Sequence, residues 1–322
     1  MRKYLLIPAL FIIICTESCN MLMIAARNVP VFFTPPDVVE VKITEPIKDD
    51  VRLSALWVGH STVLIQMDDK VILTDPIFTE TAGEFARRVV EPGIDIENIP
   101  KCDLIIISHS HFDHLSYGSL EYLEKKNKNT PLVFPKDLEY FLPDYDFDLI
   151  RMKNNEGYVN DIVGETKTIN GIKVTTVYAQ HWGGRYGIDG YVWGSHAYTG
   201  YVLEYNGLTV YFAGDTGYDP DKFKKLGAMF KIDLACIPIG PCAECYNCGT
   251  LNHVFPPDAV YIFNDINAKW MVPIHYGTFV FAQADPMEPL PAFRKIIADE
   301  KIEDKVKILK IGEQVVLLEK EP

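Results

Sequence analysis

The segment Ser108-His109-Ser110-His111-Phe112-Asp113-His114 decides the interpretation of this chain. It directly follows Asp103–Ile107, which predicts a buried strand. A strand that stops abruptly leaves the next residues at the edge of a sheet, where their side chains can converge. Imidazole nitrogens and carboxylates suit zinc-like ions. Alternate residues can face two ions, His109 and His111 one ion, Asp113 and His114 the other. The alternative is a surface loop that is rich in histidine by chance. Histidine is uncommon in this chain, with 8 in 322 residues, so a chance cluster is disfavoured.

Apolar patterns on both sides of this segment predict an α/β fold. Strands are expected at Val51–Val58, Val63–Gln66, Val71–Leu73, Lys173–Tyr178, Tyr198–Tyr205, Leu208–Phe212, Leu234–Ile237, Trp270–Pro273 and Val315–Leu318. Helices are expected at Tyr117–Lys126, Asp137–Phe141, Asp219–Phe230, Pro257–Asn264 and Leu290–Asp299. Asp68-Asp69-Lys70 and Asn206-Gly207 predict hairpin turns. Hairpins and buried strands followed by helices, occurring twice, predict two mixed sheets packed together with helices outside.

The overall composition is that of a globular protein. Hydrophobic residues make up 48% of the chain and charged residues 23%. The length allows one large domain or two fused halves. The net charge of −13 disfavours a nucleic-acid binder, because phosphate contacts need a basic surface.

The first nineteen residues predict an export signal. Arg2 and Lys3 precede the apolar run Tyr4–Cys15, which is followed by small or polar residues. Twelve apolar residues cover only about 18 Å of helix, against a hydrocarbon core of about 30 Å, so a membrane span is disfavoured. A buried N-terminal helix is the alternative.

A bacterial lipoprotein cleavage site is expected at the end of this signal. Ser18 precedes the acceptor thiol of Cys19, although Thr16 and Glu17 depart from the common motif. A lipid anchor at Cys19 that faces the periplasm is therefore expected, with plain export as the alternative. Residues 20–50 are Pro-rich and predict an irregular tether and entry arm, before a folded domain over residues 51–322.

The His109–His114 segment resembles the metal-binding motif of the metallo-β-lactamase superfamily. Three further motifs occur in the superfamily's order, each after an expected strand: His181, then Asp215 in Phe212-Ala213-Gly214-Asp215, then His275. The resemblance implies a four-layer αββα sandwich that holds two metal ions. His109, His111 and His181 would hold the first ion. Asp113, His114 and His275 would hold the second, and Asp215 would bridge the two.

Flanking motifs resemble one branch of this superfamily. They are Trp57-Val58-Gly59-His60-Ser61-Thr62, Leu73-Thr74-Asp75-Pro76-Ile77-Phe78, Ile237-Pro238-Ile239-Gly240, His253 with Pro257-Asp258-Ala259-Val260, and Ile274-His275-Tyr276-Gly277-Thr278-Phe279. The branch contains the N-acyl-phosphatidylethanolamine-hydrolysing phospholipase D and bacterial RomA-like proteins. The ascorbate-6-phosphate lactonase group is more distantly similar, through Gly59-His60 and Thr74-Asp75-Pro76.

The resemblance implies hydrolysis by a hydroxide bridged by two divalent ions. Zinc is expected, and manganese or iron could use the same ligands. Two ions can lower the pKa of a shared water from ~15.7 towards ~7 and polarise the scissile group. A phosphodiester, small or lipid, is the leading substrate class. A lactone or other cyclic ester is the alternative, and a non-catalytic envelope metal-binding protein is a third hypothesis.

Other residues are expected to support this centre. Asp75 would orient a ligand histidine from behind, unless it is only a turn residue. The candidate catalytic residues are Asp113, His60 and His253, of which the two histidines would act as proton donors or oxyanion stabilisers unless they serve packing or capping. For His196 a surface or core role is expected.

The chain departs from the branch at three positions, all expected to be loops near the cleft. Arg151–Glu156 lacks the aromatic and acidic residues of the relatives, and His196 replaces a tryptophan. The third departure is Cys242-x2-Cys245-x2-Cys248, for which a disulfide is expected in an exported protein. A separate metal site with Cys236, or free thiols, are the alternatives. The metal chemistry is therefore expected to carry over to this chain, and the relatives' substrate is not.

Overall fold

The computed structural model describes residues 23–40, 42–83, 86–154, 158, 160–186, 189–192, 196–243, 245–281 and 285–321. The expected export signal and the expected lipid attachment at Cys19 lie outside these residues. No helix in the described part of the chain is long and apolar enough to cross a membrane.

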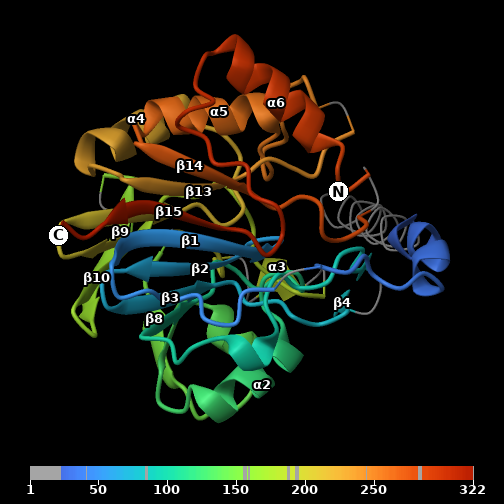
Figure 1. Ribbon diagram of the computed structural model, residues 1–322, viewed down its shortest axis with the longest axis horizontal. Coiled ribbons are helices and arrows are strands. Elements are labelled where there is room, and N and C mark those ends of the chain that lie inside the picture. Colours follow the sequence, from blue (N-terminus) through green and yellow to red (C-terminus); the bar gives the residue numbers. More distant parts are fainter. Residues whose placement is uncertain are drawn as a thin grey trace, which may run out of the picture.

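Two mixed sheets form the centre of the molecule (Figure 1). The seven-stranded sheet has the order β15 (Gln314–Glu319), β1 (Val51–Gly59), β2 (Thr62–Met67), β3 (Lys70–Thr74), β6 (Leu104–Ile106), β7 (Pro131–Pro135) and β8 (Asp148–Met152). The six-stranded sheet has the order β14 (Trp270–Ile274), β13 (Leu234–Pro238), β12 (Leu208–Phe212), β11 (Gly200–Tyr205), β10 (Ile172–Val177) and β9 (Val163–Ile169). A small pair, β4 (Thr81–Ala82) and β5 (Ala86–Arg87), lies apart from both.

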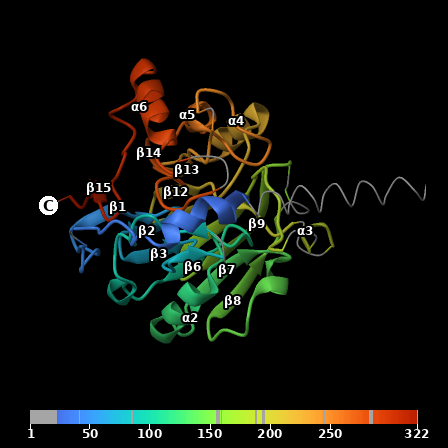
Figure 2. The ribbon, with the colours of Figure 1, turned by 90° about the vertical axis from the view of Figure 1, so that its right-hand side faces the viewer.

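Helices cover the outer faces of both sheets, which completes the expected αββα sandwich (Figures 1 and 2). On the six-stranded sheet lie α4 (Pro220–Met229), α5 (Pro256–Asp265) and α6 (Pro289–Asp299). On the seven-stranded sheet lies α2 (Tyr117–Lys126). Shorter elements are α3 (Asp189–Val192) and the 3-10 turns η1 (Ile96–Asn98) and η2 (Leu138–Phe141).

The sequence of β1 explains why the sheets pack in this way. Leu53, Ala55 and Trp57 belong to the core between the two sheets, whereas Leu56 and Val58 belong to the core beneath α2. Alternate residues of a strand point to opposite faces of its sheet. Because β1 is apolar on both faces from Ala55 to Val58, this part of the strand can lie only in the middle of a layered fold.

Most of the strands and helices expected from the sequence are confirmed within two residues of their bounds. The helix expected at Asp137–Phe141 is the 3-10 turn η2 instead. The strands β7, β8 and β9 were not expected. Arg151 and Met152 end β8, so the expectation that Arg151–Glu156 is a loop is wrong for these two residues.

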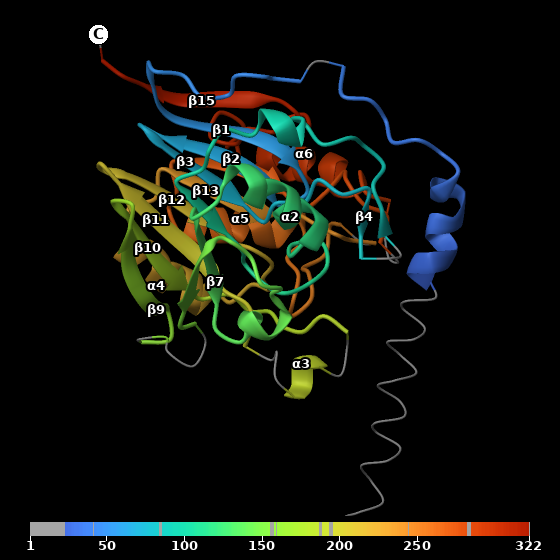
Figure 3. The same ribbon diagram turned by 90° about the horizontal axis from the view of Figure 1, so that it is seen from below.

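The expectation of an irregular segment over residues 20–50 is also wrong in part, because residues 23–32 are helical. This helix lies beside β4 and β5 (Figure 3). Asn28 accepts a hydrogen bond from the backbone nitrogen of Arg87 and donates one to the carbonyl oxygen of Val280. Ile24 packs against the small apolar cluster that contains Phe279. The hydrogen bonds of Asn28 and the apolar packing of Ile24 together hold the helix against the domain.

Candidate metal centre

The strand directions bring the expected site residues to one edge of the sandwich. β3 is parallel to β6, and β12, β13 and β14 are parallel to one another. β10 runs in the same direction as β12, because both are antiparallel to β11. Residues 108–114 follow β6, and His181, Asp215 and His275 follow β10, β12 and β14. All lie just past the carboxyl ends of strands.

Three imidazoles form the first group. The Nε2 atom of His109 lies 2.9 Å from Nδ1 of His111, and Nε2 of His181 lies 3.2 Å from the same nitrogen. Nitrogen ligands of a tetrahedral zinc ion lie about 3.3 Å apart, since each is about 2.05 Å from the metal. The three histidines therefore have the spacing that one ion requires.

The second group combines Asp113 with His114 and His275. The Oδ2 atom of Asp113 lies 3.6 Å from Nε2 of His114 and 3.5 Å from Nε2 of His275. Nε2 of His60 donates a hydrogen bond to the same oxygen at 2.9 Å. All four residues lie close enough to contribute to one metal site.

Asp215 lies between the two groups. Its Oδ2 atom is 3.1 Å from Nε2 of His275, 3.5 Å from Nε2 of His114 and 4.0 Å from Nε2 of His109. Its Oδ1 atom is buried without a hydrogen-bond partner, and so are Nε2 of His111, Nε2 of His114 and both ring nitrogens of His275. An unpaired buried polar atom destabilises the fold, and a bound metal ion would give these atoms the partner that they lack. The side chains therefore fit a metal site.

The electrostatics of the centre separate neutral from charged groups. Burial lowers the pKa of His60 to about 3 and that of His111 to about 4, so both imidazoles are neutral. Burial alone would raise the pKa of Asp215, but the nearby His275 and His114 outweigh it and hold this pKa well below its usual range. The site therefore offers neutral imidazoles and an ionised carboxylate, the forms that bind metals.

The imidazoles of His114 and His275 behave differently. Burial lowers their pKa values, but carboxylates outweigh it: Asp215 and Asp113 hold the pKa of His114 well above its usual range, and the same pair raises that of His275 to about 9. Both side chains would release a proton on binding a metal.

Asp75 lies behind the second group, completely buried at the end of β3. Its Oδ1 atom accepts a hydrogen bond from the backbone nitrogen of Ser108 at 2.6 Å. Its Oδ2 atom accepts bonds from Oγ of Ser108 at 2.6 Å and Nδ1 of His114 at 2.7 Å. Burial raises the pKa of Asp75, and it outweighs these three hydrogen bonds, which lower the pKa. The residue joins the start of the metal-binding loop to one of its histidines.

His60 is held by its backbone at a meeting point of three segments. Its carbonyl oxygen accepts hydrogen bonds from Nε1 of Trp57 and from the backbone nitrogen of His275. Its own nitrogen donates to Oγ1 of Thr278 at 2.7 Å. The residue is only 1% exposed and lies behind Asp113, where it borders a small cavity with His275 and Phe279.

His253 lies on the open side of the centre. Its side chain is 30% exposed, whereas those of His109, His114 and His275 are at most 2% exposed. Its Nδ1 atom lies 3.4 Å from Oδ2 of Asp215. Solvent or a substrate can therefore reach His253 more easily than those three histidines.

Two residues that support the centre are not among those expected from the sequence. The guanidinium of Arg185 lies 4.2 Å from the ring centres of both Phe112 and Tyr117, and its NH1 donates to the carbonyl oxygen of Ser110 at 2.9 Å. The carbonyl oxygen of Asn252 accepts a hydrogen bond from Nδ1 of His181 at 2.8 Å. Only the nearness of Arg185 to His181, and of Asn252 to His253, could have drawn attention to them.

The remaining candidate residues lie away from the two groups. His196 is partly exposed, and its Nδ1 lies 3.3 Å from Oδ2 of Asp137. A disulfide joins Cys242 to Cys245, which confirms the expected loop disulfide, and the alternative of a metal site at these cysteines is wrong. Cys236 is a buried thiol in β13, and Cys248 is an exposed one.

The fold and the site together define a metal-dependent hydrolase. A family model described as a beta-lactamase superfamily domain matches residues 70–276, which contain Asp215 and the six residues that we assign to the two groups. The chain belongs to the metallo-β-lactamase superfamily.

Individual relatives agree with this assignment. The chain is 31% identical to a UPF0173 metal-dependent hydrolase of Thermodesulfovibrio yellowstonii over 80% of this chain and 90% of that protein. It is 28% identical to N-acyl-phosphatidylethanolamine-hydrolyzing phospholipase D 1 of Caenorhabditis elegans over 78% of this chain and 72% of that protein. A possible metal-dependent hydrolase of Veillonella parvula shares the fold, with a TM-score of 0.63, 16% identity and coverage of 83% of this chain and all (100%) of that one.

Proposed function

We propose that this chain hydrolyses amphiphilic phosphodiesters, of the phospholipid type, with two divalent metal ions. The observation that carries the proposal is the pair of buried ligand groups on either side of Asp215. The similarity to a phospholipase D supports the substrate class.

Seven side chains would hold the ions. His109, His111 and His181 would bind the first, Asp113, His114 and His275 the second, and Asp215 both. Zinc suits this set of nitrogen and oxygen donors, and manganese or iron can use it too. Such ions lower the pKa of water and polarise the scissile phosphoryl group.

Other residues of the chain would orient the centre and move protons. Asp75 holds His114 with Nε2 facing Asp113 and Asp215. His60 holds Oδ2 of Asp113 from the buried side. His253, the accessible imidazole, would transfer a proton to the departing oxygen of the substrate.

Apolar side chains beside the open side of the centre support an amphiphilic substrate. The ring of Trp182 lies 4.3 Å from that of His111, and Phe281 stacks on His275 with ring centres 6.3 Å apart. Leu251, next to the segment that bears His253, is 75% exposed. A substrate with a phosphodiester group and an apolar portion could contact these side chains while its phosphorus lies at the metals.

The experiment is a comparison of the zinc-loaded wild type with His109→Ala and Asp215→Ala on a phosphodiester panel and a lactone panel. We expect phosphodiester turnover in the wild type and none in either variant, with circular dichroism spectra unchanged. Undiminished turnover in both variants would end the proposal. Wild-type turnover confined to the lactones would assign the alternative cyclic-ester activity.

We also propose that the protein is exported and anchored through Cys19, which would hold the enzyme beside membrane lipids. Mass spectrometry of protein extracted from membranes should show an acylated Cys19 at the new N-terminus. An unmodified Met1 would contradict both the anchor and the export.

A further inference from the structure

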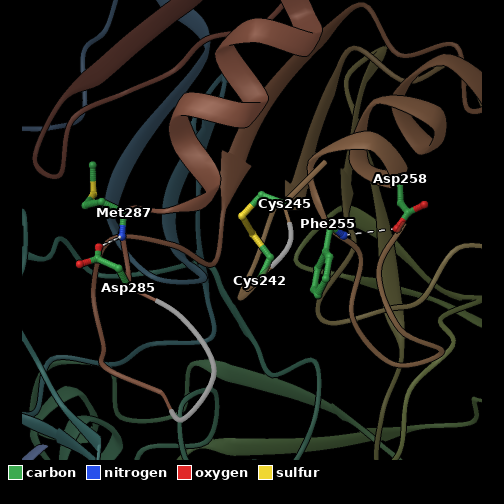
Figure 4. Close-up of a disulfide and its surroundings, with 6 residues drawn as sticks. All are labelled: Cys242, Cys245, Phe255, Asp258, Asp285 and Met287. Atoms are coloured by element: carbon green, nitrogen blue, oxygen red, sulfur yellow. Dashed lines mark hydrogen bonds between the residues drawn. A yellow bond between two sulfur atoms is a disulfide. The ribbon is translucent and has the colours of Figure 1, made fainter. Parts of the chain in front are cut away.

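The Cys242–Cys245 disulfide lies in the loop between β13 and α5, the same loop that carries Asn252 and His253. Both cysteines are buried and form an apolar cluster with Ala292 of α6. Phe255 packs against this cluster, and Figure 4 shows it near the disulfide. Phe255 is the residue immediately before α5 and only two residues after His253. The disulfide therefore contacts the end of the segment that reaches the metal centre.

Residues 249–254, which we call the histidine turn, touch His181 of the first ligand group and Asp215, which lies between the groups. The carbonyl oxygen of Asn252 accepts the hydrogen bond from Nδ1 of His181. The ring of His253 lies against Asp215. A small displacement of the histidine turn would change the surroundings of two of the residues that we propose as ligands.

The histidine turn is held closely at its base. The backbone nitrogen of Thr250 donates to the carbonyl oxygen of His253 at 2.8 Å, and that of Val254 donates to the carbonyl oxygen of Thr216 at 2.8 Å. The carboxylate of Asp258 accepts hydrogen bonds from the backbone nitrogens of Gly249 and Phe255. Figure 4 shows the second of these bonds beside the disulfide.

Two glycines show how little space surrounds this turn. A Cβ atom on Gly249 would lie 2.1 Å from the carbonyl oxygen of His253, and one on Gly217 would lie 2.2 Å from that of Leu251. The backbone of the turn packs directly on its neighbours. Its position is therefore sensitive to whatever fixes its ends.

We propose that the Cys242–Cys245 disulfide is a brace that positions the histidine turn against the metal centre. The inference rests on the proposed function only in taking His181 and Asp215 as metal ligands. Opening a loop as short as Cys242–Cys245 frees chain entropy that corresponds to about a 20-fold change in the ratio of ordered to open loop. Loss of a partner behind a ligand histidine weakens metal binding roughly 10-fold or more.

One cysteine of the brace, Cys245, lines a groove. A groove of about 330 Å³ is lined by Cys245, by Ala243 and Tyr246 of the same loop, and by Glu288 and Pro291 at α6. We expect a water-soluble phosphine to reduce the disulfide from this groove. Two thiols form, and the phosphine becomes its oxide by taking the oxygen of a water molecule, which also supplies both protons.

The test compares the double variant Cys242→Ser/Cys245→Ser with Cys248→Ser, a matched control that removes the exposed thiol of the same loop and leaves the disulfide intact. Hydrogen exchange of the backbone amides of Thr250 and Val254 is measured in metal-free protein. Zinc affinity is measured separately by competition with a chromophoric chelator. We expect about 20-fold faster exchange and roughly 10-fold weaker zinc binding in the double variant, and no change in Cys248→Ser.

Phosphine-reduced, metal-free wild type gives the same exchange measurement without any mutation, in case the double variant does not fold. Unchanged exchange in the reduced wild type, or free thiols at both Cys242 and Cys245 in protein purified without reductant, would overturn the proposal. Because exchange requires neither metal nor substrate, faster exchange in a protein that lacks phosphodiesterase activity would reject the proposed function and leave the brace supported.

Discussion

The Oδ2 atom of Asp75 accepts a hydrogen bond from Nδ1 of His114 at 2.7 Å, and neither side chain is exposed. With Nδ1 occupied in this way, Nε2 of His114 is the nitrogen that faces Asp113 and Asp215. Asp75 also accepts both hydrogen bonds from Ser108, the first residue of the metal-binding loop. One buried carboxylate thus fixes the ring orientation of a histidine and the start of the loop that carries it.

We predict that Asp75→Ala weakens zinc binding 10- to 100-fold, the range typical when the carboxylate behind a ligand histidine is lost. Competition with a chromophoric chelator would measure the change. Asp69→Ala is the matched control, because the Asp69 side chain is 66% exposed and lies in the β2–β3 turn. Equal zinc affinity in wild type and Asp75→Ala would show that the hydrogen bond to His114 has no such role.

The two ligand groups predict the metal stoichiometry. Zinc-loaded wild type should retain two ions per chain after gel filtration, as measured by elemental analysis. His181→Ala removes a member of the first group only, and His275→Ala removes a member of the second only. Each variant should therefore retain about one ion. A single ion in the wild type, lost in only one of the variants, would mean that only one group binds metal.

Metal removal should also lower stability. A ligand that binds only the folded state at 1,000 times its dissociation constant stabilises that state by about 4 kcal/mol per site. Thermal unfolding with and without a chelator should show a large decrease in Tm for the wild type. The decrease should be smaller for His181→Ala, which would lose one ion at most. Equal decreases in the two proteins would contradict two separate sites.

The elements predicted from the sequence are those with continuous apolar runs or clear hairpin turns, such as β1, β6 and β12. The missed strands lack these signals for physical reasons. β7 begins and ends with proline, which usually marks the limits of a strand. β8 and β9 are the outer strands of their sheets, and several of their side chains are exposed. Strands that bury few side chains, such as β8 and β9, lack a clear alternation of apolar and polar residues in the sequence.

The site was predictable where its residues act through side chains that follow a strand. Asp75 and His60 were found in this way. Asn252 was missed because it acts through its backbone carbonyl, which any residue could supply. Arg185 was missed because its role depends on the meeting of two loops, one with Ser110 and Phe112 and the other after His181. A contact between two loops that are far apart in the sequence produces no periodic pattern of residues.

Arg185→Met should lower the free energy of unfolding by about 2 kcal/mol. The variant loses the hydrogen bond to Ser110 and the stacking between Phe112 and Tyr117. Urea denaturation would measure the loss. Arg185→Lys should recover only part of it, because an ammonium group cannot stack as a planar guanidinium does. Arg151→Met is the control, since that side chain is 57% exposed, and it should change stability by less than about 0.5 kcal/mol.

The last prediction separates two roles that His253 could have. If it transfers a proton, His253→Ala should lower kcat about 10²- to 10⁴-fold and leave the zinc content at two ions. His253 also lies within ligand distance of His181 and Asp215, so loss of zinc in this variant would assign it as a ligand instead.

His253→Gln sharpens this comparison, because the amide can still donate to Asp215 but cannot exchange a proton. We expect His253→Gln to bind zinc like the wild type and to remain as slow as His253→Ala. His196→Ala, in which the lost imidazole lies beside Asp137 rather than at the centre, should keep wild-type kcat. Recovery of kcat in His253→Gln would reject proton transfer, since only the polar contact with Asp215 would then matter for turnover.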